Sequence, residues 1–281
     1  MVEFLTQDAH VSFPLFGKTI DFIIYNSNLL LIQPIIEEIK IEALALEKIF
    51  NLFDKESELN RLNEKRDLVV SKHLLRVIKE ALVFCELTSG AYDISLGQVF
   101  LARKKGPELP KINCSYKDIK INKNRIRLTH PDVLIDLGSI AKGYITDILA
   151  QKIKKLGIES CLINSRGDIR IFGSVTEEIN IQNPRDKGKF IDSFELKNAS
   201  VATSGDYNQY QGSFDNSHII NAGDLISITI ISKDLMQADA LATALFVSSQ
   251  SLQEKIIKKY PKTKIFMVTQ SQEVKKINWF E

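Results

Sequence analysis

Cysteine is scarce in this chain, and its few thiols are far apart. The 281 residues include three cysteines, Cys85, Cys114 and Cys161, without a CxxC pair. An odd number of widely spaced thiols argues against a disulfide framework, and the missing pairs argue against a cysteine-based metal site. Long apolar runs are missing as well. The longest, residues 29–36, is interrupted by a glutamine and a proline and is too short to span a bilayer.

An excess of either charge is also missing. The chain has 37 Lys and Arg residues against 35 Asp and Glu residues, for a formal net charge of +2, and no strongly basic block. Nucleic acid is therefore not the expected partner. The N-terminal segment MVEFLTQDAHVSFPLFGK has no basic stretch ahead of an apolar one and no cysteine for lipidation. We expect a cytoplasmic protein without a membrane anchor, although an exported protein stripped of its signal would show the same pattern.

Several motifs that would identify a chemistry are absent. The chain has no HExxH, no Ser-His-Asp order of a triad hydrolase, no GxxxxGK[ST] of a P-loop and no GxGxxG of a dinucleotide fold. It offers instead carboxylates, a hydroxyl, a lysine and a histidine around turns of small residues. Such groups suit a Mg2+-assisted reaction at a phosphate better than thiol or zinc chemistry.

The order of expected elements favours an α+β fold in a single domain, residues 1–281. No linker, repeat or low-complexity segment divides the chain, and strands and helices alternate irregularly rather than as βαβ units. The pattern predicts helices over 35–53, 72–87, 140–156, 236–246 and 250–259, with a polar connection at 62–66. It predicts strands over 19–25, 68–70, 116–121, 125–129, 133–136, 160–164, 168–172, 178–182, 190–196, 199–203, 217–220, 226–231, 263–268 and 273–278.

The segment from Met236 to Phe246 carries the clearest chemical signal. Ala and Leu dominate it, and nothing in it breaks a helix. Asp239 and Thr243 lie four residues apart, so a helix stacks their oxygen atoms on one face, where they can hold a hard cation such as Mg2+. The alternative is an aspartate near a helix start and a threonine that bonds back to a carbonyl of the preceding turn.

A second segment, from Ile135 to Tyr144, predicts a phosphate site. A strand ends at Asp136, a turn of small residues follows, and Lys142 lies in the first turn of the next helix. Backbone N–H groups at such a helix start, together with an ammonium, bind phosphate. The alternative is a tight strand-to-helix turn with Lys142 in solvent.

Three further segments carry polar groups without a decisive pattern. Asp93 follows a helix end at Gly90, as it would in a plain connection between a helix and a strand. The polar turn of residues 203–206 is either an anion site or a simple turn. His218 lies beside an expected strand, where a lone histidine is more often structural than catalytic.

Taken in order, these segments resemble the ApbE-type family, the FAD:protein FMN transferases. They span roughly residues 57–250, in the order in which the family has them. Each motif is weak alone, and the ordered set carries the resemblance. The matching stretches are SELNRLN (57–63), SGAYDISLG (89–97), IDLGSIAKGYITD (135–147), LINSRGDIRIFG (162–173), VATSGDY (201–207), HIIN (218–221) and MQADALATALFV (236–247).

The resemblance implies an α+β enzyme with mixed, largely antiparallel sheets, packed helices, a T-fold-like architecture and a ligand cleft between the sheet layers. Such enzymes bind FAD with Mg2+ (or Mn2+) between its phosphates, transfer FMN to a Thr or Ser hydroxyl of an acceptor flavoprotein and release AMP. The side chains of Asp239 and Thr243 and the backbone carbonyl of Ser139 would hold the cation, and His218 would accept the hydroxyl proton. FAD contacts would fall at Phe16, Asn63, Ala91, Tyr92, Asp93, Asp136, Lys142, Thr203, Ser204, Gly205 and Asp206.

Three departures from the family pattern distinguish this chain. Phe16-Gly17-Lys18-Thr19 stands where the family has Met-Gly-Thr, and Ser165-Arg166-Gly167-Asp168 places a bulky cation in an Ala-Gly-Gly-Asp motif. The family's loop after the histidine is shortened to His218-Ile219-Ile220-Asn221-Ala222-Gly223, without its proline and threonine. Two alternatives to transfer therefore stay open: FAD binding with weakened catalysis, and hydrolysis of FAD to FMN and AMP.

Overall fold

The computed structural model describes residues 7–279 apart from 28, 104, 105, 107, 187 and 206–223. An eight-stranded sheet forms its largest layer, and every neighbouring pair of strands in it is antiparallel. Within the described part of the chain, no helix is long and apolar enough to cross a membrane. The sheet order is β1 (Gln7–Leu15), β2 (Lys18–Ser27), β6 (Cys161–Ser165), β7 (Asp168–Phe172), β10 (Ser200–Gly205), β11 (Leu225–Ser232), β12 (Lys264–Thr269) and β13 (Val274–Ile277).

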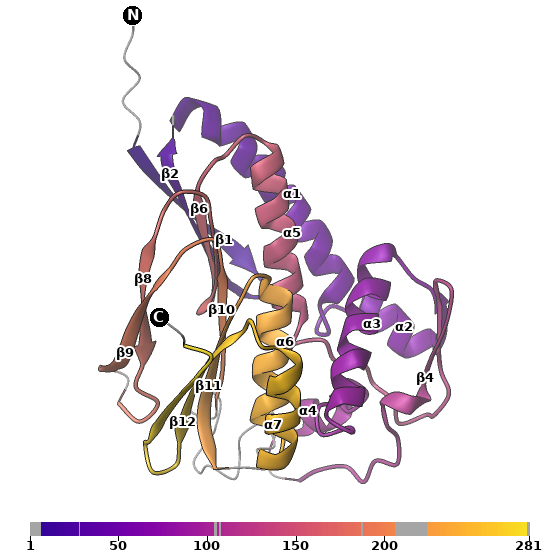
Figure 1. Cartoon of the computed structure of the whole chain (residues 1–281). Coiled ribbons are helices and arrows are strands. Elements are labelled where there is room, and N and C mark those ends of the chain that lie inside the picture. The colour runs from indigo at the N-terminus through magenta and orange to yellow at the C-terminus, as the bar shows by residue number, and fades with distance from the viewer. Residues whose placement is uncertain are drawn as a thin grey trace, which may run out of the picture.

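Three helices cover one face of this sheet (Figure 1). Helix α1 (Leu29–Phe50) lies against β1, α5 (Ala141–Lys155) against β6 and β7, and α6 (Leu235–Phe246) against β10 and β11. The hairpin of β8 (Glu177–Gln182) and β9 (Phe190–Leu196) packs on the opposite face through a separate apolar cluster. The mainly antiparallel α+β fold expected from the sequence is confirmed.

A smaller lobe lies beyond the helices, on the side away from the sheet (Figure 1). Its helix α3 (Lys72–Leu87) packs against α6, and α7 (Gln250–Lys259) also contacts α6. The other elements of the lobe are α2 (Glu58–Lys65), α4 (Gly97–Arg103), the 3₁₀ turn η1 (Tyr116–Asp118) and the three-stranded sheet of β3 (Asp67–Val69), β5 (Arg125–Leu128) and β4 (Ile119–Asn122).

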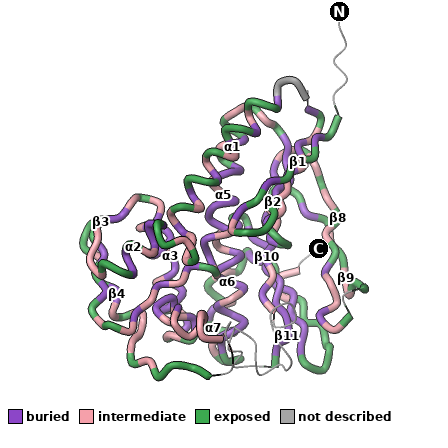
Figure 2. Tube along the Cα trace, turned by 180° about the vertical axis from the view of Figure 1, so that it is seen from behind, coloured by how far each residue is buried: buried purple, intermediate pink, exposed green. Residues whose placement is uncertain are grey.

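Helix α6 lies in the middle of these layers, and most of its residues are buried (Figure 2). The strand against it, β11, is buried along all of its 8 residues. A helix that is apolar on every side is typical of such a central position, since each face meets protein. Because Asp239 lies on this helix, its carboxylate is buried in the core and is only 4% exposed. A charge buried so deeply needs partners.

Helix α5 fixes the start of α6. The carboxylate of Asp147 accepts hydrogen bonds from the backbone N–H groups of Leu235 (3.1 Å) and Met236 (2.9 Å). One turn earlier, Gly143 brings the two backbones together, because a Cβ at this position would lie 2.5 Å from the carbonyl oxygen of Leu235. Glycine is therefore required where α5 passes the N-terminus of α6.

The structure corrects several expected elements. Residues 62–66 were expected to be a connection, but they belong largely to α2, whose N-cap Ser57 accepts a hydrogen bond from Asn60 N at 3.1 Å. Leu59 and Leu62, three residues apart, supply the buried face that makes this polar segment a helix. Residues 133–136 form only a single bridge at Leu134 instead of a strand. Helix α1 starts earlier than expected and continues through Pro34, and β1 was not expected.

Replacing Gly143 by alanine is expected to destabilise the protein by about 2 kcal/mol or more, because the new methyl group meets backbone that cannot move aside cheaply. Urea unfolding followed by circular dichroism measures the loss. Gly106→Ala is the matched control, since nothing lies within 4 Å of a Cβ there. Equal stability of the two variants would show that α5 and α6 are not held in close contact.

Candidate active site

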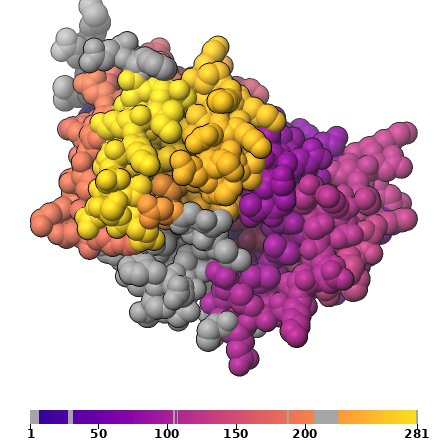
Figure 3. Space-filling view, turned by 60° about the horizontal axis from the view of Figure 1, so that its bottom comes forward, coloured from indigo at the N-terminus to yellow at the C-terminus, as the bar shows by residue number. Residues whose placement is uncertain are grey.

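A cavity of about 480 Å³ opens at one end of the eight-stranded sheet, between the sheet and the smaller lobe. Segments far apart in the sequence line it: the β1–β2 and β6–β7 turns, the ends of α1 and β10, the connection from α3 to α4, the turn before α5, and α6. Figure 3 shows a recess between the C-terminal segments, coloured orange, and the purple and magenta segments of the smaller lobe.

Most of the residues predicted from the sequence meet at this cavity. Asn63 does not line it: its side-chain amide donates to Ile135 O (3.0 Å) and accepts from Ile135 N (2.7 Å), and thereby supports the chain just before Asp136. Its contact with FAD stays a prediction. Asp206 and His218 lie outside the described residues. The predicted residues that line the cavity are Phe16, Ala91, Tyr92, Asp93, Asp136, Ser139, Lys142, Thr203, Ser204, Gly205, Asp239 and Thr243.

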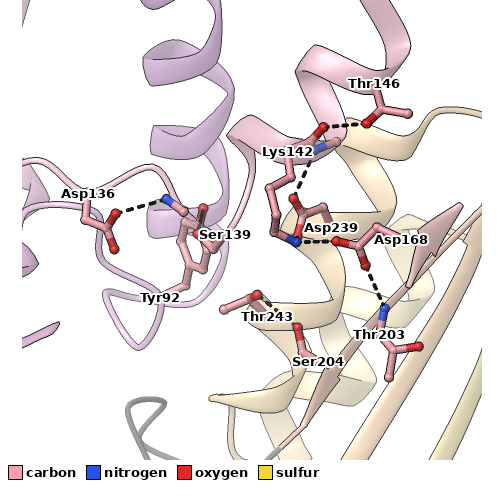
Figure 4. Close-up of polar contacts among 12 residues, drawn as sticks. Tyr92, Asp136, Ser139, Lys142, Thr146, Asp168, Thr203, Ser204, Asp239 and Thr243 are labelled. Carbon is pink, nitrogen blue, oxygen red and sulfur yellow. Dashed lines mark hydrogen bonds and ion pairs between the residues drawn. The ribbon is translucent and has the colours of Figure 1, made fainter. Parts of the chain in front are cut away.

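The polar centre of the cavity is a lysine shared by two carboxylates. The Nζ of Lys142 pairs with Asp168 and lies 3.3 Å from Asp239 Oδ1, so that α5, β7 and α6 meet at one ammonium (Figure 4). Asp168 also accepts from Thr203 N at 3.3 Å, and Asp239 from Gly143 N at 3.1 Å. The alternative of Lys142 in solvent is wrong, because the side chain is 26% exposed and paired on both sides.

Charge in this cluster is unevenly compensated. Burial by itself lowers the pKa of Lys142, but the attraction of Asp168 and Asp239 outweighs it, so the ammonium stays charged. Burial raises the pKa of Asp239 above its ordinary value, because Lys142 offsets only part of the lost solvation and Asp168 repels the second carboxylate. Two carboxylates and one ammonium leave a net charge of −1 when all three are ionised. The cluster is therefore suited to a further cation.

Two further oxygen groups that line the cavity, from Thr243 and Ser139, could accept such a cation together with Asp239. The hydroxyl of Thr243 lies 3.0 Å from Ser204 Oγ, so it meets the end of β10 instead of bonding back to its own helix. Among the described residues, no hydrogen-bond donor meets the carbonyl oxygen of Ser139, which lies just before the N-cap of α5, Ile140. In the described part of the chain, no three His, Cys, Asp or Glu side chains lie together in a group that could hold a metal ion.

The other wall holds an aromatic ring and two carboxylates. Tyr92 is buried, and its OH accepts a hydrogen bond from Ser139 Oγ at 2.8 Å. Burial raises the pKa of Tyr92 well above its ordinary value, so the phenol stays neutral. Asp136 accepts from Gly138 N at 3.0 Å and holds the turn before α5. Asp93 accepts from Ser95 N (2.8 Å) and Tyr116 N (2.9 Å), so it braces its loop.

Several residues of the cavity region were not singled out as site residues from the sequence. Asp168 lies within a matched segment, LINSRGDIRIFG, and its position there was the available signal. Phe50 and Phe53 come from the end of α1, where an apolar pattern indicates only core. Arg166 lines the cavity from the β6–β7 turn, in the motif where the sequence departs from the family.

Replacing Lys142 by methionine is expected to destabilise the protein by about 2–3 kcal/mol at pH 7, because two buried carboxylates lose their cation while solvent screens part of the cost. Burial already raises the pKa of the Asp239 carboxyl, and loss of the ammonium that opposes this shift raises the pKa further. The destabilisation should therefore shrink as the pH falls toward 5. Urea unfolding at the two pH values measures it.

The double variant Lys142→Met/Asp168→Asn is the control for this prediction. It leaves one buried carboxylate, so part of the lost stability should return. A loss that is the same at both pH values, with no recovery in the double variant, would contradict a shared ammonium.

Comparisons with known proteins agree with this geometry. The profile of the ApbE family matches residues 16–267. FAD:protein FMN transferases of Vibrio cholerae and Escherichia coli K12 are 29% and 25% identical to this chain, over 87% and 79% of it and over 82% and 73% of their own lengths. The solved structure of flavin transferase ApbE from Vibrio cholerae covers 96% of both chains with a TM-score of 0.80 and 24% identity.

The ApbE protein of Thermotoga maritima has a similar solved structure. It matches with a TM-score of 0.82 and 25% identity, over 96% of this chain and 97% of that one. These likenesses accord with the antiparallel sheet and the helices described above. The family match spans nearly the whole chain, which confirms the resemblance inferred from the motifs. The protein belongs to the ApbE family.

Proposed function

We propose that this protein is a FAD:protein FMN transferase, which takes FAD as its substrate, moves the FMN half onto a Thr or Ser hydroxyl of an acceptor flavoprotein and releases AMP, with Mg2+ as the cofactor. Its relatives in Vibrio cholerae and Escherichia coli carry the name of this activity. The observation that supports it best is the single cavity in which Lys142, Asp239 and Thr243 lie together with the predicted FAD contacts.

The residues at the cavity fit a hard divalent cation. The Asp239 carboxylate, the Thr243 hydroxyl and the carbonyl oxygen of Ser139, which no described donor meets, are the kinds of oxygen ligand that Mg2+ takes. The net negative charge of the cluster favours a cation for the same reason. When bound there, Mg2+ supplies stabilisation of negative charge on the phosphates. Mn2+ has the same ligand preference and could replace it.

Lys142 would supply a second positive charge to a phosphate bound in the cavity. Its ammonium is held by Asp168, which is itself fixed by the backbone N–H of Thr203, so the charge is positioned before substrate arrives. Phosphoryl transfer depends mainly on such preorganised charge, because there is little covalent work for the protein to do. Tyr92, neutral and 4% exposed, provides an apolar wall for a ring of FAD.

The proposed reaction is a displacement at phosphorus. The acceptor oxygen forms a bond to the phosphorus of the FMN half, the bond from this phosphorus to the bridging oxygen breaks, and AMP leaves with the electron pair. The hydroxyl proton needs an acceptor. His218, which lies outside the described residues, stays the predicted base, since its ordinary pKa of about 6.5 suits proton transfer near neutrality.

Intact-mass analysis of a flavin-acceptor domain, incubated with this protein, FAD and Mg2+, tests the proposal. We expect the acceptor to gain one FMN while AMP is released, and EDTA to abolish both. AMP and free FMN without a modified acceptor would indicate hydrolysis. Bound FAD that stays intact would indicate a binding protein with weakened catalysis, and either result would count against transfer.

Asp239→Asn is expected to slow transfer about a hundredfold or more, since even outer partners of metal ligands are worth about 10–100-fold. Asparagine keeps an oxygen that can accept from Gly143 N, so the fold should persist. Mg2+ should raise the melting temperature of the wild type but not of this variant. Asp234→Asn, at the exposed N-cap of the same helix, is the control and should behave as wild type. Undiminished transfer by Asp239→Asn would exclude the metal assignment.

A further inference from the structure

Two hairpin turns at the end of the large sheet place bulky side chains against the cavity. In the β1–β2 turn, Phe16 and Gly17 have φ of 51° and 66°, and in the β6–β7 turn, Arg166 and Gly167 have φ of 64° and 95°. Two successive residues with positive φ are typical of a type I′ turn, which favours Asn or Gly at its first position. A larger residue there costs about 1 kcal/mol or more. Phe16 and Arg166 occupy that position, and both line the cavity.

The two turns lie side by side and carry two cations. Strands β2 and β6 are neighbours in the sheet and pair antiparallel as far as Asp21 and Asn164, so the start of β2, with Lys18, and the turn after β6, with Arg166, lie at the same end of the sheet. Neighbouring strands are about 4.8 Å apart. Lys18 and Arg166 are both exposed and both line the cavity. Among the described residues, no carboxylate lies within 4.0 Å of either cation, in contrast to Lys142.

The cationic turn is close to the cluster around Lys142. Asp168, which holds that ammonium, is the first residue of β7 and pairs directly with Ser165 across the turn. Arg166 is therefore two residues from Asp168 in the sequence, on the turn that joins β6 to β7. Arg166 and Lys142 line the same cavity, so a group bound at Lys142 shares that cavity with Arg166.

We infer that Arg166 and Lys18 form a second anion subsite, separate from the metal ligands, which binds the phosphates of the dinucleotide substrate and of the AMP product. The inference rests on the proposed function, because it takes FAD as the substrate. A guanidinium holds two phosphate oxygens at once, and the neighbouring ammonium adds charge without needing a fixed geometry. Two exposed cations that line a cavity also attract an anionic substrate from solution.

The position of the pair favours phosphate over a carboxylate of the acceptor protein. Both cations line the same cavity as Lys142 instead of facing outward on a separate surface. The cluster itself is net negative, so a diphosphate that enters needs further positive charge beyond Lys142 and the metal. Arg166 has a positive φ, which is strained for a residue other than glycine. A functional role for its charge would account for an arginine at such a position.

Equilibrium titration of the full chain with FAD and with AMP, in Mg2+ and at low salt, tests the inference with the double variant Arg166→Gly/Lys18→Gln. We expect the Kd for both nucleotides to rise about tenfold, and the difference to shrink at high salt. Arg166→Lys should restore part of the affinity. Glycine adopts a positive φ without strain, so Arg166→Gly should be at least as stable as the wild type. A measured melting temperature that is not lowered would confirm that the variant is folded.

Lys123→Gly is the matched control. Lys123 is also an exposed cation with positive φ (54°) at a hairpin turn, between β4 and β5, and it does not line the cavity. Its loss should leave both Kd values unchanged.

Unchanged nucleotide affinity in the double variant would overturn the inference. A raised KM for the acceptor protein, with unchanged FAD affinity, would overturn it as well and assign the cations to the acceptor. Wild-type protein that binds FAD but transfers nothing would contradict the proposed function alone, because the titrations still measure the subsite. Wild-type protein that binds neither nucleotide would contradict both.

Discussion

The burial of one carboxylate on an apolar helix is the constraint on which this site depends. Asp239 is carried into the core by α6, where an unpaired charge would cost several kcal/mol. It persists there because Gly143 N and Lys142 Nζ meet it from α5. Both groups are within reach only because the backbones of α5 and α6 touch. A single glycine therefore links the packing of the two helices to the chemistry of the cavity.

The same cluster leaves the cavity electrostatically incomplete. Lys142 serves two carboxylates, and among the described residues no donor meets the carbonyl oxygen of Ser139, which precedes the N-cap of α5. The N–H of Gly143 has no acceptor within the first turn of its own helix and donates to Asp239 instead. The charge and the oxygen atoms that a divalent cation needs arise from how the two helices pack. The β1–β2 and β6–β7 turns supply the remaining charge from the end of the sheet.

The sequence predicted the fold best where a local signal and the tertiary environment agree. Helix α5 ends before Gly157 and α6 is rich in Ala and Leu, and both lie close to where the pattern predicts them. The prediction was wrong where composition hid the buried face. In α2 the many polar residues outnumber Leu59 and Leu62, so the apolar face of this helix is not visible in the composition. Residues 133–136 include β-branched side chains that favour a strand, but in the structure they make only one bridge.

The sequence by itself determined the family, the spacing of Asp239 and Thr243 on one helix face, and the presence of Lys142 in the first turn of the helix that follows Asp136. These features are local, so they can be read along the chain. Only the tertiary structure decided that Lys142 is buried between Asp168 and Asp239, and that Arg166 and Lys18 lie on neighbouring hairpin turns. Such pairings join residues far apart in sequence, and strand register and helix contact set them, which no local pattern encodes.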